Sequence, residues 1–239
     1  MKLTFLGTRG YIETATPRHR RHSLLQVASA QTRVLIDCGE DWLGELASLR
    51  PDAIFLTHAH PDHAWGLQEG APCPVFATAE SWELLADYPL AERRTVLPRE
   101  PVRFGNLTFE PFPLQHSIRA PAVGYRISEG EVSVFYAPDV VYIAERAEAL
   151  QRCRLYIGDG ATVRQSFVRK EGDQLFGHTP VMTQLTWCRK EGVAKMLVTH
   201  CGEEIVTGEE KGVLEEIAAL ARARQVEVEV AWDGMEVQL

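Results

Sequence analysis

The chain has 239 residues and a formal net charge of −8, and 45% of its residues are hydrophobic while 24% are charged. This apolar content excludes a disordered chain, and a chain of this length can bury a core that needs no disulfides. The acidic balance argues against a protein that grips long nucleic acid through a basic surface. No apolar run approaches the roughly 20 residues of a membrane span, and Gly7 interrupts the N-terminus too early for a secretory segment.

The five cysteines are widely spaced and form no CxxC pair. This spacing argues against a disulfide framework and a structural zinc knuckle, and it favours a reducing, cytoplasmic location. The length, together with the lack of repeats or an obvious linker, predicts a single domain over residues 1–239.

The first half of the chain is rich in short β-favouring runs bounded by glycine or polar residues. Strands are predicted at 2–6, 23–28, 33–37, 53–57, 75–77, 102–104, 107–111, 122–127 and 132–136. The run 53–57 is almost entirely apolar, which indicates a strand buried on both faces. A helix is expected over 42–49 and ends before Pro51, because the residue preceding a proline is disfavoured in the helical region.

The second half alternates strands and helices. Strands are predicted at 155–157, 195–199, 226–231 and 235–239, and helices at 180–190 and 208–224. Thr179 and Pro180 match an N-cap followed by proline at the first helical position. Asp233 and Gly234 predict a hairpin turn between the last two strands. This order predicts two sheets covered on their outer faces by helices.

The densest polar cluster is the segment 57–66, THAHPDHAWG, directly after the apolar run. His58 and His60 can point to one side of an extended loop, while Asp62 and His63 can face a second ion from the following turn. Imidazole and carboxylate are ligands for Zn²⁺, Mn²⁺ or Fe²⁺. A solvated loop with scattered histidines is the alternative, but it does not explain why they crowd the end of an apolar strand. We therefore predict two divalent metal ions, with Zn²⁺ as the first choice.

Two ions need more ligands, and three further candidates follow other predicted strands: His116, Asp139 and His200. Each of these alone is typical of a capped turn or a hydrogen-bonded core residue. Together with the cluster at 58–63, they favour a shared metal site.

The pattern HxHxDHxxG at 58–66, followed by separate His, Asp and His, resembles the metallo-β-lactamase-fold hydrolases. The segments FLGT at 5–8 and RHSLL at 21–25 are similar to the opening of the ribonuclease Z and cyclic-phosphodiesterase branch. The resemblance implies an α+β fold, a four-layer αβ/βα sandwich with the metals at one edge between the sheets. It assigns one ion to His58, His60 and His116, the other to Asp62, His63 and His200, and a bridging role to Asp139.

The order of three later motifs also resembles ribonuclease Z: GDGAT at 158–162, GHT at 177–179 and VTH at 198–200. His178 matches the histidine that contacts the scissile phosphate in that branch and assists protonation of the leaving group. However, Asp159 and Gly160 stand where that branch has histidine and glutamate, so the glutamate expected to orient His178 is missing. The alternative for His178 is a residue at the start of a helix with no chemistry.

Asp37 resembles the strand-end aspartate that hydrogen-bonds a ligand histidine in this superfamily, and such partners fix imidazole orientation. An ordinary Asp-x-Gly turn explains it nearly as well.

The resemblance implies phosphodiester hydrolysis by a metal-activated hydroxide, with Asp62 and His178 as the catalytic residues. Ions about 3.5–4 Å apart lower the pKa of a shared water toward about 7. Asp62 would orient this water or take its proton, and His178 would donate to the leaving oxygen or to the phosphate.

Ribonuclease Z carries a protruding arm that grips tRNA, and we find no Gly/Pro-rich or basic insertion in this sequence that could serve as one. Together with the acidic charge, this favours a small or cyclic phosphodiester, such as a cyclic nucleotide or a cyclic ribose phosphate, over RNA. The basic run from Arg18 to His22, as well as Arg119 and Arg164, could bind phosphate or could simply be solvated.

Several alternatives stay open. The same fold could carry a tRNA-processing endonuclease, a thioester or lactone hydrolase, a redox diiron protein or a scaffold without catalysis. The sequence predicts no membrane partner. It leaves the oligomeric state open, with a homodimer as one alternative.

Overall fold

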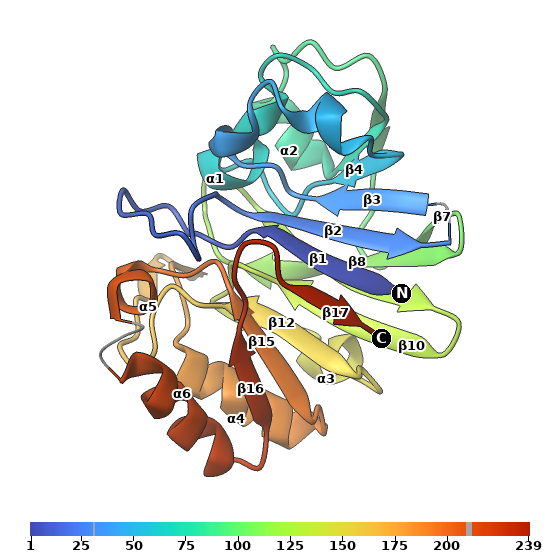
Figure 1. Cartoon of the computed structure of the whole chain (residues 1–239). Helices are drawn as coiled ribbons and strands as arrows, with labels where there is room; N and C mark the ends of the chain where they lie inside the picture. Colours follow the sequence, from blue (N-terminus) through green and yellow to red (C-terminus); the bar gives the residue numbers. More distant parts are fainter. Residues whose placement is uncertain (31, 209–211) are drawn as a thin grey trace.

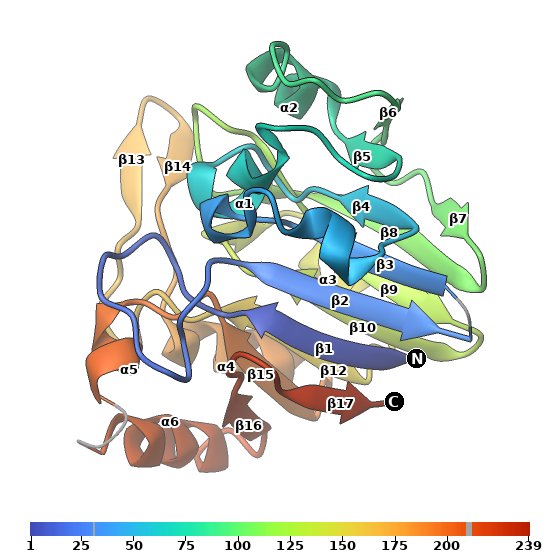
Figure 2. The ribbon, with the colours of Figure 1, turned by 45° about the horizontal axis from the view of Figure 1, so that its top comes forward.

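The molecule consists of two β-sheets packed face to face, with helices on the outer face of each (Figure 1 and Figure 2). The structure is a computed structural model that describes residues 1–30, 32–208 and 212–239. The predicted α+β, four-layer αβ/βα sandwich is confirmed. Within the described ranges, every helix is too short or too polar to cross a bilayer.

The first sheet has the strand order β17-β1-β2-β3-β4-β5-β6. Its antiparallel part joins β17, β1, β2 and β3, and its parallel part joins β3 to β6. The strands are β1 (Lys2–Gly7), β2 (Leu24–Ser29), β3 (Thr32–Ile36), β4 (Ala53–Phe55), β5 (Val75–Ala77), β6 (Arg93–Thr95) and β17 (Glu236–Gln238).

The second sheet has the order β11-β8-β9-β10-β12-β15-β16, and β7 pairs with β8. Its strands β10, β12, β15 and β16 run parallel to one another. The strands are β7 (Val102–Phe104), β8 (Leu107–Gln115), β9 (Ala122–Glu129), β10 (Val132–Ala137), β11 (Tyr142–Ile143), β12 (Leu155–Asp159), β15 (Lys195–Thr199) and β16 (Glu227–Val230).

Aromatic side chains join the two sheets. The ring of Phe55 in β4 lies 4.3 Å from that of Phe109 in β8, centroid to centroid. Tyr125 in β9 donates a hydrogen bond of 2.8 Å to the carbonyl oxygen of Leu56. All four residues are fully buried, and burying such a side chain contributes about 1.5–3 kcal/mol. This core fixes the position of one sheet relative to the other, and therefore the edge where both sets of strands end.

Helices cover the outer faces through two further apolar clusters. The first sheet is covered by η1 (Glu40–Trp42), η2 (Leu46–Leu49), α1 (Pro61–Ala64), η3 (Trp65–Leu67) and α2 (Ala79–Leu84). The second is covered by α3 (Arg146–Ala149), α4 (Val181–Glu191), α5 (Glu203–Gly208) and α6 (Val213–Arg222).

Three helix predictions need correction. The segment 42–49 contains two 3₁₀ turns instead of one helix, because Gly44 takes a positive φ of 75° between them. Pro180, with extended backbone, is the N-cap of α4 in place of Thr179, and its carbonyl accepts the first helical hydrogen bonds. The helix expected at 208–224 begins only at Val213, as α6. Gly208 is instead the last residue of α5, which was not predicted. Residues 209–211 of the expected helix lie outside the described residues.

The hairpin predicted at Asp233 and Gly234 is also wrong. The strands on either side belong to different sheets, since β16 pairs with β15 and β17 pairs with β1. The Asp233 carboxylate accepts hydrogen bonds from the backbone N–H of Thr8 and of Arg20 and Arg21, at 2.9–3.0 Å. The turn therefore ties the C-terminal crossover between sheets to the N-terminal loop.

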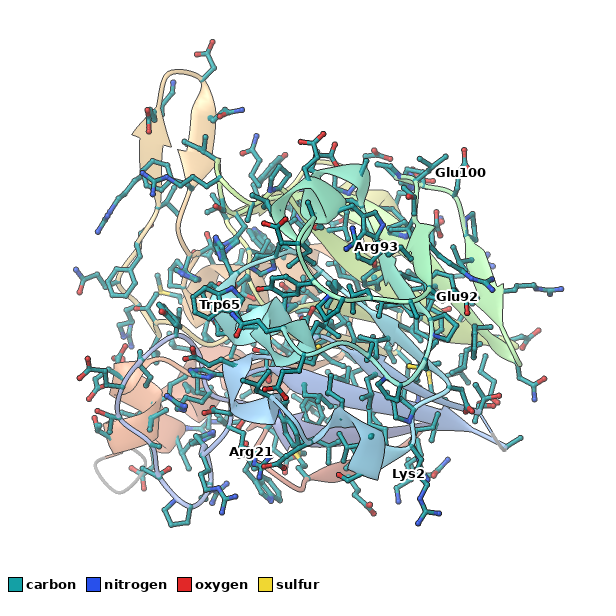
Figure 3. All side chains as sticks on the ribbon, turned by 90° about the horizontal axis from the view of Figure 1, so that it is seen from above. Lys2, Arg21, Trp65, Glu92, Arg93 and Glu100 are labelled. Atoms are coloured by element: carbon teal, nitrogen blue, oxygen red, sulfur yellow. The ribbon has the colours of Figure 1, made fainter. Side chains whose placement is uncertain are left out.

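A small hairpin, β13 (Arg169–Glu171) and β14 (Gln174–Phe176), stands out from the body of the molecule (Figure 2), and Figure 3 shows it from above. The sequence reasoning did not predict it. Immediately after it, Gly177 donates its N–H to the carbonyl of His116 at 2.8 Å. The base of the hairpin is thus attached to the predicted metal site.

Candidate metal centre

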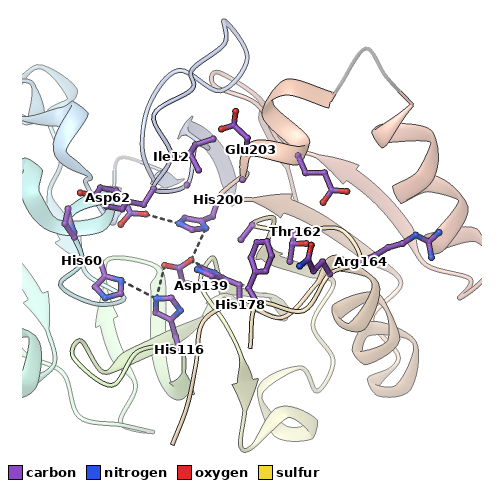
Figure 4. A pocket seen from close by; sticks show the side chains of 18 residues that line it. Ile12, His60, Asp62, His116, Asp139, Thr162, Arg164, His178, His200 and Glu203 are labelled. Carbon is purple, nitrogen blue, oxygen red and sulfur yellow. Dashed lines mark hydrogen bonds and ion pairs between the residues drawn. The ribbon is translucent and has the colours of Figure 1, made fainter. Parts of the chain in front are cut away.

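The predicted site residues come together where strands of both sheets end (Figure 4). Asp37 follows β3, and the segment of His58 follows β4 in the first sheet. In the second sheet, His116, Asp139 and His200 follow β8, β10 and β15. Asp37 and His200 have positive φ values of 62° and 51°. Such left-handed backbone at non-glycine residues is uncommon and costs free energy, and here it occurs at the site itself.

A single helical turn presents the last two residues of the cluster at 58–63. His60 is the extended N-cap of α1, and Pro61 occupies the first helical position, where a missing N–H has no cost. The turn brings Asp62 and His63 inward, and both are buried. The backbone N–H of Cys38 donates to the His63 carbonyl at 2.6 Å, so that β3 and the turn are held together.

The side chains form two groups that could each hold an ion. Within each group, the candidate ligand atoms all lie within 4.8 Å of one another. The first group is His58, His60, His116 and Asp139, and the second is Asp62, His63, Asp139 and His200. Asp139 belongs to both, as expected for a bridging carboxylate. A third overlapping group combines Asp139 and His200 with Asp159 and His178.

The donor atoms have the character that a metal ion requires. His63 Nε2 lies 3.1 Å from Asp139 Oδ2, and His200 Nδ1 lies 2.9 Å from Asp139 Oδ1. Nevertheless His63 Nε2, His200 Nδ1 and Asp139 Oδ1 make no aligned hydrogen bond among the described residues, although all are buried. Buried polar atoms are rarely left without a partner. The three atoms therefore fit ligands whose natural partner is a cation.

Charge complementarity supports the same conclusion. Burial alone would raise the pKa of Asp139, yet His200, His116 and His63 around it hold the pKa well below its usual range. Burial lowers the pKa of His58 well below its usual range, and the neighbouring His63 lowers it further. Burial would lower the pKa of His63 and of His200, but the surrounding carboxylates, Asp62 for His63 and Asp139 for His200, raise both values well above the usual range. Because divalent cations bind ionised carboxylates and neutral imidazoles, a cation would take the place of the protons on these two histidines.

Asp37 is placed as predicted. Its Oδ2 lies 2.9 Å from Nδ1 of His63, and its Oδ1 accepts the N–H of Thr57 at 2.8 Å. The carboxylate is fully buried. Because this hydrogen bond engages Nδ1, it fixes the imidazole of His63 with Nε2 toward Asp62 and Asp139.

The glutamate expected to orient His178 is absent, as the sequence indicates, but another carboxylate takes its place. Asp159, the last residue of β12, places Oδ2 2.8 Å from Nδ1 of His178. A side chain at Gly160 would meet the Thr199 carbonyl at 2.6 Å, so no glutamate could serve from that position. Burial would lower the pKa of His178, but the Asp159 and Asp139 carboxylates outweigh burial and raise it.

The candidate phosphate-binding cations lie mostly elsewhere. Arg18 stacks on Trp232 and Arg21 on Trp42, and within the described part of the chain neither lines the cavity at the site. Arg119 does not line it either. Arg164 does, and its guanidinium forms an ion pair with Glu216 of α6.

A cavity of about 780 Å³ opens over the cluster, which is within the range of small-molecule sites. Its inner end is formed by His60, Asp62, His116, Asp139, His178 and His200. Its lining also includes the exposed Tyr11 and Phe167, toward its mouth, and the half-buried Ile12, none of which the sequence reasoning identified. These three residues lie in loops and belong to no recognisable motif. No pattern in the sequence could therefore have identified them as lining the cavity.

Residues 32–201 match the family model of the beta-lactamase superfamily domain, which covers well over half of the chain. The chain belongs to the beta-lactamase superfamily. Membership of this superfamily implies divalent metal ions, and the two His/Asp groups are the residues that would hold them.

Curated relatives of this superfamily member include ribonuclease Z proteins. It is 31% identical to ribonuclease Z from Methanopyrus kandleri over 147 residues, which are 54% of this chain and 51% of that protein. It is also 31% identical over 173 residues to an octanoyltransferase from Porphyromonas gingivalis, covering 62% of this chain and 34% of that protein. The chain thus spans between a third and a half of the length of these relatives.

Solved structures of the same fold align over nearly the whole chain. The metallo-beta-lactamase fold protein YhfI from Bacillus subtilis has a TM-score of 0.74 at 19% identity, covering 99% of this chain and 98% of that one. A diphosphatase of the PhnP family has a TM-score of 0.70 at 18% identity, with 100% and 97% coverage. The short form of human tRNase Z has a TM-score of 0.67 at 18% identity, with 100% and 99% coverage. The resemblance expected from the motifs is confirmed.

Proposed function

We propose that this chain is a metal-dependent hydrolase, and within that class a phosphodiesterase acting on a small or cyclic phosphodiester. The observation that carries the proposal is the Asp159–His178 pair, whose imidazole lines the same cavity as the His/Asp cluster. Metal ligands alone are compatible with attack on a carbonyl or on a phosphate. A carboxylate-oriented histidine beside them adds a proton donor for a departing oxygen.

The ligand assignment proposed from the resemblance agrees with the grouping of the side chains. His58, His60 and His116 would hold one ion, Asp62, His63 and His200 the other, and Asp139 both. When bound, a pair of divalent ions supplies Lewis acidity, which lowers the pKa of water and neutralises charge on a phosphoryl oxygen. Zn²⁺ is the proposed metal, and Mn²⁺ or Fe²⁺ suit the same ligands.

Asp62 would orient the attacking water and accept its proton. Its Oδ2 is held by Nε2 of His200 at 2.9 Å, and the side chain lines the inner end of the cavity. Burial would raise its pKa, but His63 and His200 hold that pKa well below its usual range, so that the group is a carboxylate.

His178 would protonate the leaving oxygen. The hydrogen bond to Asp159 engages Nδ1, so Nε2 is the ring nitrogen available to a substrate in the cavity. The rings of His178 and His116 lie 5.1 Å apart between centroids. A phosphate held beside His116 would therefore be within reach of His178.

Ribonuclease Z-like processing of tRNA is the second candidate, because the similarity to ribonuclease Z proteins extends over about half of the chain. The net charge of −8 and the mixed charges of the β13–β14 hairpin weigh against an extended RNA partner. A cytoplasmic location remains part of the proposal and is supported by the five widely spaced cysteines, which form no CxxC pair. A homodimer remains one alternative for the assembly.

The test combines metal analysis with a substrate panel. The purified protein is assayed with bis-p-nitrophenyl phosphate, a 2′,3′-cyclic nucleotide, a thioester, a lactone and a precursor tRNA. We expect about two metal equivalents per chain, turnover of the small diesters, and loss of this turnover with a chelator. Preferred turnover of the thioester or lactone would refute the phosphodiesterase assignment, and efficient cleavage of the precursor tRNA would favour the second candidate.

A further inference from the structure

Two aromatic side chains line the outer part of the cavity while staying in contact with solvent. Tyr11 is 63% exposed and Phe167 is 42% exposed. Only one other tyrosine, phenylalanine or tryptophan in the described ranges is so exposed, namely Tyr142 in β11, and it does not line the cavity. Large exposed apolar groups beside a pocket indicate a surface that contacts a ligand.

The loop of Tyr11 is fixed to the site. Gly10 donates its N–H to the carbonyl of Cys201 at 3.0 Å, directly beside His200. A Cβ at Gly10 would lie 3.1 Å from the His200 ring, so the loop packs closely against that imidazole. On the other side of Tyr11, the Arg9 guanidinium donates to the Ile12 carbonyl. The backbone on both sides of Tyr11 is therefore held in place before any ligand binds.

Phe167 is fixed to the other side of the site. Its N–H donates to the carbonyl of His178 at 3.1 Å. Gly177, with a φ of 104°, packs against the Phe167 carbonyl so closely that a Cβ would overlap it. Each aromatic residue is thus anchored by a backbone hydrogen bond at or next to a histidine of the cluster, and preorganised contacts of this kind favour binding.

We infer that Tyr11 and Phe167 bind a planar aromatic group, so that the phosphodiester substrate carries a nucleobase. The inference rests on the proposed function and specifies its substrate class. A phosphate and one sugar would occupy the inner end of the cavity, and a bare sugar phosphate would leave both rings facing water. Gln165 and Arg164 also line the outer part and offer polar groups to the edge of a base. Aromatic side chains stack on any base, so the pair selects nucleotides without selecting one base.

The experiment compares two ligands that share a ribose 5-phosphate and differ at the anomeric carbon, which carries a base in one and a hydroxyl group in the other. Binding of adenosine 5′-monophosphate and of ribose 5-phosphate to the metal-loaded protein is measured by isothermal titration calorimetry. We expect the nucleotide to bind about 25- to 100-fold more tightly, because each of the two aromatic side chains would contribute about fivefold to tenfold. Phe167→Leu and Tyr11→Leu keep apolar bulk but remove the ring face, and each should weaken nucleotide binding about fivefold to tenfold. Ribose 5-phosphate binding should not change.

Two further variants serve as controls. Phe167→Tyr retains a ring and should keep the wild-type affinity for the nucleotide. Tyr142→Leu removes an exposed ring elsewhere and should change neither affinity. Equal affinities for the two ligands, no measurable nucleotide binding, or wild-type nucleotide affinity in both leucine variants would overturn the inference.

Failure of the inference and failure of the proposed function give different results. Equal binding of the two ligands, together with turnover of small diesters, would refute only the base-binding role. Preferential nucleotide binding without any diester turnover would refute only the phosphodiesterase assignment.

Discussion

Asp159 and His178 form a hydrogen-bonded pair, with Oδ2 of the carboxylate 2.8 Å from Nδ1 of the imidazole. Asp159 is fully buried at the end of β12, whereas the side chain of His178 is 25% exposed and borders the cavity. The same carboxylate accepts the N–H of Val140 and of Ala161, at 3.1 and 2.8 Å. The backbone thus fixes Asp159, and Asp159 in turn orients His178.

Asp159→Asn should lower kcat and leave the metal content unchanged. The substitution keeps the shape of the side chain but removes the charge that orients His178, and loss of such a partner typically costs about 10- to 100-fold. Steady-state kinetics on a small diester would show a change in kcat with little change in KM. Metal content by mass spectrometry is the control, and a loss of ions would mean that Asp159 serves the metal site instead.

His178→Ala should lower diester turnover more strongly, by about 10²- to 10⁴-fold, because it removes the proton donor itself. His178 belongs to neither of the two proposed ligand sets, so both metal equivalents should remain. The comparison of both variants by kinetics and elemental analysis separates the two roles. Wild-type turnover in His178→Ala would contradict the assigned role.

His60→Ala should abolish activity and remove at least one metal equivalent. His60 is one of the three histidines of the first group, and its Nδ1 lies 3.0 Å from Nε2 of His58 and 3.3 Å from Nε2 of His116. The matched control is Ser117→Ala, which removes the hydroxyl 3.2 Å from Nε2 of His60 and should retain both ions. Full metal content in His60→Ala would exclude this residue as a ligand.

Gly39→Ala should reduce metal binding although the φ of −61° suits any residue. A Cβ there would overlap the backbone carbonyl of Asp62, so α1 must shift and move its ligands. Gly130→Ala is the control: its φ of 57° costs about 1 kcal/mol of stability, but nothing lies near its Cβ. Metal titration followed by tryptophan fluorescence or calorimetry should show weakened affinity only for Gly39→Ala.

The buried His22 should make stability depend on pH. Burial, followed by the Arg9 guanidinium, lowers its pKa to about 4 even though Asp41 lies 2.8 Å from Nδ1. The unfolded chain takes up the proton near pH 6.5, whereas the folded protein does so near pH 4. Stability is therefore retained above pH 6.5 and lost as the pH falls toward 4, by at most about 1.4 kcal/mol per pH unit.

The measurement is denaturant unfolding of the wild type and of His22→Gln between pH 7 and pH 4. As the pH falls, the wild type should lose stability relative to the variant, because only the wild type carries His22. The other histidines are common to both proteins, so their effects cancel in the difference. A difference that is independent of pH would contradict the burial of a neutral His22.

The sequence predicted those parts of the site that are local. His58, His60, Asp62 and His63 lie within one turn-length segment, so their spacing alone indicated a metal site. Most strands were found because each has its own β-favouring run. The prediction of one domain over 1–239 stays a prediction.

Features that depend on contacts between distant segments were missed. The turn at Asp233 reads locally as a hairpin, but the pairing of β17 with β1 places its strands in different sheets. The role of Asp159 depends on the end of β12 lying against His178, a contact between residues 19 positions apart that no local pattern reveals. The exposed β13–β14 hairpin and the short α5 have too little apolar periodicity to be predicted.

The two proposed ligand sets each combine residues from both sheets: His116, Asp139 and His200 follow strands of the second, and the remaining ligands follow β4 of the first. Neither sheet alone supplies a complete set. Ion uptake is consequently linked to the packing of one sheet on the other, and each bound ion would oppose their separation. A substitution that disturbs the packing of the two sheets should therefore weaken metal affinity even when it lies far from every ligand.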